Sequence, residues 1–185
     1  MTINVGDRAI EVPEIEYWIK RSKQRKSRYW ADADNLERET KKQFKIAYDE
    51  LEKELYRFAG KQGVNGQLKY SQTRIVMLMK EIMPHINGLY DVHEAELHAL
   101  LKNTYEENLL KNLYELTIGT HVYYSFVGIN EKAVEAAITY PWSGESFSAR
   151  IYNDKARLIT VMRQEITQSI IRGEPIATTS EIVSK

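Results

Sequence analysis

Between residues 15 and 58, apolar and small side chains recur at steps of three and four, and this periodicity limits most strongly how the chain can fold. Such steps place one stripe of side chains on one face of an α-helix. The pattern predicts a long helix over residues 14–59, with Pro13 suited to its start and Gly60 to its end. At 1.5 Å per residue this helix is roughly 65–70 Å long, so it must reach across, or out of, its own domain.

A short buried helix is predicted after the glycine-bearing loop that follows the first helix. Apolar residues fill most of positions 75–83, Ser71 can cap the start, and Pro84 can stop the helix. Asn87 and Gly88 then favour a turn. A break is therefore expected between this short helix and the next one.

A second long amphipathic helix is predicted over about residues 92–126. Asp91 and Glu94 lie three positions apart and form a capping-box pattern at its start, and Gly128 follows its end. Short connections usually join antiparallel helices. We therefore expect an antiparallel helical hairpin at the centre of the fold.

The two ends of the chain add smaller elements. A short helix is expected over residues 130–140 and a last helix over residues 146–172, ended by Gly173. Residues 1–13 are interpreted as a tail or a short strand, and residues 178–185 could begin another helix with nothing to bury it against. The predicted fold class is mostly α, with a long helical arm, an antiparallel helical hairpin and short packing helices.

The composition excludes several function classes. Lysine plus arginine and aspartate plus glutamate both total 26, so no net charge draws the whole molecule towards DNA or membranes. There is no cysteine, which excludes disulfides, thiolate metal ligands and thiol catalysis. No apolar run reaches the roughly 20 residues that span a bilayer.

No motif of catalysis or of cofactor or metal binding is found. His93 and His98 flank Glu94 but are five positions apart, about 140° around a helix, whereas the zinc motif needs a spacing of four. The glycines from Gly60 to Gly66 match neither the dinucleotide fingerprint nor a Walker loop. We therefore predict a protein without enzymatic activity, cofactor or metal.

One basic segment of the first helix is a candidate contact with another macromolecule. Its cations are interleaved with aromatic residues, including Tyr29 and Trp30, a mixture that can bind phosphates or an acidic protein surface. A solvated helix face with core aromatics explains the same pattern. The candidate residues are Tyr17, Trp18, Lys20, Arg21, Lys23, Arg25, Lys26 and Arg28.

Two stretches resemble the head-morphogenesis, or minor head protein, family of tailed double-stranded-DNA phages, which is defined by a Mu-F-type domain. The first is Tyr17, Trp18, Ile19, Lys20, Arg21, Ser22, Gln24 and Arg25, similar to the family's Y-W-x-x-R-S-x-Q-R opening. The second is Pro141, Trp142, Ser143, Gly144, Phe147, Ser148, Arg150 and Ile151, similar to its P-W-S-G-x-x-F-S-x-R-I-W segment, with Tyr152 in place of the second Trp.

The second stretch is interpreted as architectural. Pro141 ends one helix, Gly144 permits a sharp reversal, and burial of Trp142 and Phe147 would hold the two sides together. Ser143 and Arg150 complete this motif.

The resemblance implies a non-catalytic protein with a few copies per procapsid, made in the host bacterial cytoplasm and located in the virion head at the portal vertex. It further implies a role in procapsid assembly and in DNA packaging or ejection. The implied partners are the portal protein, double-stranded DNA, and capsid or scaffold proteins, with self-association open and no membrane. The resemblance covers about residues 14–185, and the Mu-F-type domain that usually follows is absent from this sequence.

Two other interpretations stay open. The chain could be the docking or delivery module of a larger toxin or enzyme whose catalytic domain is missing. It could also be a coiled-coil interaction protein, which would form a homodimer indifferent to portal and DNA.

Overall fold

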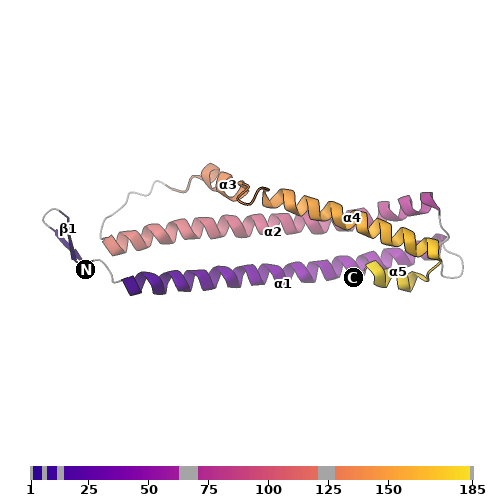
Figure 1. Ribbon diagram of the computed structural model, residues 1–185, viewed down its shortest axis with the longest axis horizontal. Coiled ribbons are helices and arrows are strands. Elements are labelled where there is room, and N and C mark those ends of the chain that lie inside the picture. Colours follow the sequence, from indigo (N-terminus) through magenta and orange to yellow (C-terminus); the bar gives the residue numbers. More distant parts are fainter. Residues whose placement is uncertain (1, 6–7, 12–14, 63–70, 121–127, 184–185) are drawn as a thin grey trace. The chain divides into compact units, whose positions relative to one another are not determined.

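The computed structural model describes residues 2–5, 8–11, 15–62, 71–120 and 128–183, and these residues are mostly α-helical (Figure 1). The predicted fold class is confirmed. The strands are β1 (Thr2–Val5) and β2 (Arg8–Glu11), and the helices are α1 (Ile15–Gln62), α2 (Gln72–Thr120), α3 (Glu131–Thr139), α4 (Phe147–Arg172) and α5 (Ile176–Val183).

The chain divides into two compact units. Unit 1 comprises Met1–Glu37 and Glu96–Tyr140, and unit 2 comprises Arg38–Ala95 and Pro141–Lys185. Each unit thus contains one part of α1 and one part of α2.

Unit 2 contains most of the buried apolar side chains of the described residues. Its parts of α1 and α2 run antiparallel, because Thr40 hydrogen-bonds His93 at 3.2 Å whereas Arg57 meets Glu81 at 3.3 Å. The predicted antiparallel pairing is present here. The core side chains from these two helices are Leu51, Leu55, Phe58, Ala59, Ile75, Leu78, Met79, Ile82, Ile86 and Tyr90.

The predicted break between the short helix and the second long helix is wrong, because α2 is one continuous helix that passes through Pro84 and Gly88. Both residues are exposed, whereas Ile82 and Ile86 on the opposite face are buried. A proline inside a helix costs about 3 kcal/mol, and each fully buried isoleucine contributes about 1.5–3 kcal/mol. Burial along one uninterrupted stripe therefore outweighs the local helix-breaking signals.

Gly88 offers a direct test of this helix continuity. A Cβ built at Gly88 meets no atom within 4 Å, and alanine is favoured over glycine in a helix interior by about 0.5–1 kcal/mol. We expect Gly88→Ala to raise the free energy of unfolding by that amount in urea denaturation. Gly173→Ala is the contrasting variant, because Gly173 has φ +70° and alanine is strained there; a destabilised Gly88→Ala would argue against the continuous helix.

The helix ends of α3 and α4 match the sequence patterns. Asn130 and Ser146 cap the two N-termini, their side chains accepting hydrogen bonds from Ala133 and Ala149. Gly173 ends α4 in the left-handed conformation. At the other boundary, α1 continues through Gly60 to Gln62 rather than ending before it.

The chain ends differ in detail from the prediction. The amino-terminal residues form two antiparallel strands, with Ile3 opposite Ile10. Helix α5 begins directly after Pro175 and is packed within unit 2: Thr179 and Ser180 are buried, and the Ser180 hydroxyl donates a hydrogen bond to Glu52 of α1 at 2.9 Å. The expectation that a helix near the end would have nothing to bury it against is therefore wrong. The predicted end of the second long helix at residue 126 lies outside the described residues.

Candidate functional site

The basic segment of α1 belongs to unit 1, where its cations point in two directions. At about 100° per residue, Arg21, Arg25 and Arg28 share one side of the helix, and Lys23 and Lys26 share the opposite side. The three arginines contact α2, and the lysines do not. The structure thus divides the predicted contact residues into an internal set and an exposed set.

The internal set centres on Glu115 of α2. Its carboxylate lies 3.5 Å from Nε of Arg21 and 3.2 Å from Nη1 of Arg25. Arg25 also donates a hydrogen bond to the side chain of Asn112. Among the described residues of unit 1, the buried side chains are Glu115 and Val134. This ion-pair cluster therefore fixes the register of α1 against α2 where apolar burial is sparse.

Arg28 forms the next pair along the same interface. Its Nη2 lies 3.2 Å from Oε1 of Glu107, and Nζ of Lys111 lies 2.7 Å from Oε2 of the same carboxylate. Because Arg21 meets Glu115 and Arg28 meets Glu107, the two helices run antiparallel in unit 1 as well.

A cavity of about 330 Å³ lies beside these ion pairs. Its lining is rich in cations, but the cations that flank Glu115 and Glu107 are already paired with those carboxylates. The four cations outnumber these two carboxylates, so positive charge remains beside the cavity, although each cation already lies in an ion pair. The lining residues are Arg21, Gln24, Arg25, Arg28, Lys111, Tyr114 and Glu115.

The carboxyl group of Glu107 should titrate below its ordinary pKa of 4.5. The hydrogen bond from Lys111 lowers the pKa most, and the charges of Lys111 and Arg28 lower it further. A lowered pKa means that the interaction stabilises unit 1 fully above pH 4.5, and that this contribution is lost as the pH falls through the lowered value. We expect Lys111→Met to move the pKa of Glu107 back up in a carboxyl NMR titration. Lys102→Met, which removes the partner of Glu106, should leave it in place, and equal shifts in both variants would contradict the assignment.

The aromatic residues at the start of α1 are half-buried. Tyr17 and Trp18 pack edge to face with ring centroids 5.1 Å apart, and the guanidinium of Arg21 lies 5.6 Å from the centre of the Tyr17 ring. These contacts are within the helix itself. Both side chains are thus only partly available to a partner.

The exposed set forms a continuous stripe on the outer side of α1. We call Ile19, Lys23, Lys26 and Trp30 the lysine face; they lie within about 60° of one another around the helix. Ile19 is 48% exposed and Trp30 is 62% exposed. Among the residues that the structure describes, none forms an ion pair or a side-chain hydrogen bond with Lys23 or Lys26, nor with the neighbouring Lys20.

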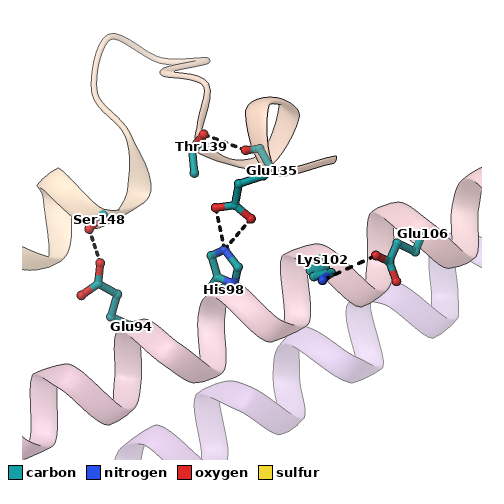
Figure 2. A network of polar contacts seen from close by, with 7 residues as sticks. All are labelled: Glu94, His98, Lys102, Glu106, Glu135, Thr139 and Ser148. Atoms are coloured by element: carbon teal, nitrogen blue, oxygen red, sulfur yellow. Dashed lines mark hydrogen bonds and ion pairs between the residues drawn. The ribbon is translucent and has the colours of Figure 1, made fainter. Parts of the chain in front are cut away.

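A polar contact joins α3 to α2 in unit 1. Figure 2 shows Nε2 of His98 between the two carboxylate oxygens of Glu135, at 3.0 Å from each. Thr139 donates a hydrogen bond to the backbone carbonyl of Glu135 at 2.7 Å. His98 therefore has a structural partner from another helix.

The motif at residues 141–150 forms the entry to α4 in unit 2. The N–H of Gly144 donates to the carbonyl of Pro141 at 3.1 Å, and Gly144 has φ +94°, which favours glycine. Arg150 donates to the hydroxyl of Ser143 across this turn. The predicted turn is present, but the predicted burial of Trp142 is wrong, because its side chain is 77% exposed and Phe147 is only half-buried. The hydrogen bonds of Gly144 and Arg150 hold this turn, rather than burial of the tryptophan.

The entry to α4 also contacts α2 within unit 2. The Ser148 hydroxyl donates to the carboxylate of Glu94 (Figure 2), and Lys155 lies 3.7 Å from Asp91. Asp91 and Glu94, predicted as a capping box, therefore lie inside α2 and bind α4.

Sequence reasoning missed the acidic partners of the arginines. Glu107, Lys111 and Glu115 recur at intervals of four along α2, which places them on one face. That spacing is visible in the sequence, but it does not say which helix this face meets.

Within the described ranges, no group of three or more His, Cys, Asp and Glu side chains could hold a metal ion, and no helix is long and apolar enough to cross a membrane. No family model, curated protein or solved structure matches the chain.

Proposed function

We propose that the chain is a non-catalytic minor head protein of a tailed phage that binds the portal vertex and assists procapsid assembly and DNA packaging or ejection. On this proposal it is made in the host bacterial cytoplasm and resides in the virion head. Its partners are the portal protein first, and double-stranded DNA and capsid or scaffold proteins second.

The observation that supports this proposal is the position of the two stretches that resemble the family. The first stretch lies on the initial turns of α1, where Arg21 and Arg25 bind Glu115. The second forms the turn and the cap that start α4. Both stretches therefore contribute to the structure of a helical protein, as expected for motifs of an assembly component rather than of an enzyme.

The proposal is tested by co-expressing the chain with the portal protein of the same phage. The complex is affinity-purified through a tag on the portal and analysed by size-exclusion chromatography with light scattering. We expect co-elution at a defined ratio. Separate elution of the two folded proteins, at low and at physiological salt, would contradict portal binding.

A coiled-coil homodimer is the second candidate, supported by the exposed apolar side chains of unit 1, among them Tyr105, Leu110 and Leu116. Light scattering of the chain alone separates the two. A stable dimer that ignores the portal would replace the proposed function.

A further inference from the structure

We propose that the lysine face of α1 is a docking surface for a protein partner whose own surface places carboxylates around an apolar groove. The proposal deepens the proposed function and rests on it, because it assigns the surface through which a head component of this kind would bind.

The charge of the segment supports an acidic partner. Residues 17–31 contain six cations and no acid. Three of these cations are arginines, which form ion pairs with Glu107 and Glu115 of α2. Among the described residues, none forms an ion pair with Lys20, Lys23 or Lys26, so their positive charges are not compensated there. An acidic surface complements this local field and steers the encounter.

The apolar residues support a groove. Ile19 and Trp30 lie at the two ends of the stripe, eleven positions apart and about 16 Å along the helix axis at 1.5 Å per residue. Spacings of i, i+4, i+7 and i+11 are those with which a helix lays one face into a groove. Tryptophan is among the residue types that are enriched at positions dominating the binding energy of an interface.

The same observations favour a protein over nucleic acid. Arginine binds phosphates in a bidentate manner and reads base edges better than lysine does, and here the arginines face α2. A phosphate backbone would also leave Ile19 without an apolar partner. A second copy of this chain is disfavoured because two lysine faces related by a two-fold axis would place like charges opposite each other.

The test measures binding of the full chain to the portal protein by surface plasmon resonance. We expect Trp30→Ala to weaken binding by roughly thirtyfold or more, as for a residue that dominates an interface. Lys23→Glu with Lys26→Glu should weaken it by about tenfold or more, mainly through slower association at low salt. Lys23→Arg with Lys26→Arg should bind like the wild type.

A matched control carries the same change in net charge on the same helix. Lys45 and Lys61 are exposed and lie outside the lysine face, so Lys45→Glu with Lys61→Glu should bind within about twofold of the wild type. Circular dichroism of every variant separates lost binding from lost folding, because these side chains bury little and should leave the helix signal unchanged.

If the wild-type chain binds the portal protein and none of the lysine-face variants changes this binding, the inference is overturned and the proposed function stands. Absence of wild-type binding would overturn both. The chain could instead bind a 30-base-pair DNA duplex in a salt-dependent manner. If Lys23→Glu with Lys26→Glu abolished this binding and left portal binding unchanged, the lysine face would be assigned to DNA and the protein partner would be overturned. A homodimer that the same variant dissociates would also overturn the protein partner.

Discussion

Ile82→Ala should lower the free energy of unfolding of unit 2 by about 2–5 kcal/mol. The side chain of Ile82 has no exposed surface, and it belongs to the stripe that keeps α2 helical through Pro84. Truncation removes apolar burial and leaves a cavity between packed helices, and both effects destabilise. Urea denaturation followed by circular dichroism measures the change.

The control for this prediction is the same substitution at an exposed isoleucine. Ile46 of α1 also lies in unit 2 but is 62% exposed, so Ile46→Ala should change the free energy by about 0.5 kcal/mol or less. If both variants lose similar free energy of unfolding, the buried side chains of α1 and α2 are not the source of the stability of unit 2.

Glu115→Gln should destabilise unit 1 by about 1–3 kcal/mol. The carboxylate is 8% exposed and forms ion pairs with both Arg21 and Arg25, and glutamine keeps its shape but removes the charge. The expected loss of stability is smaller than for a fully buried ion pair, because both arginines retain access to water. Amide hydrogen exchange along α2 near residue 115 reports this local loss without interference from unit 2.

Glu107→Gln provides the comparison on the same helix face. Glu107 and its partner Arg28 are both more than a third exposed, and exposed pairs contribute only about 0–1 kcal/mol. If amide exchange rates rise equally in the two variants, burial of Glu115 does not determine how much this residue contributes to the stability of unit 1.

Periodicity and capping residues predicted the long first helix, the start of α3 at Asn130 and both ends of α4. These features depend on side chains within a few positions of each other, so the local sequence contains the necessary information. The continuity of α2 could not be predicted in the same way. It depends on Ile82 and Ile86 finding a buried partner surface, which outweighs Pro84 and Gly88 only in the folded chain.

The candidate site was predicted as one basic segment, and the structure resolves it into two faces. Helical geometry alone separates Arg21 and Arg25 from Lys23 and Lys26. Which face meets α2 depends on Glu115, 90 positions beyond Arg25 in the sequence, and no local pattern reports a contact at that range. Portal or DNA contact by these residues stays a prediction, now focused on the lysine face.

Site-specific photo-crosslinking in assembling heads tests the central claim most directly. A photoreactive amino acid in place of Trp30 is compared with the same group in place of Ile46, which is equally exposed on α1 but lies outside the lysine face. We expect a crosslink from position 30 to the portal protein and none from position 46. Crosslinks from position 30 that reach only DNA or another copy of this chain, or equal crosslinking from both positions, would contradict it.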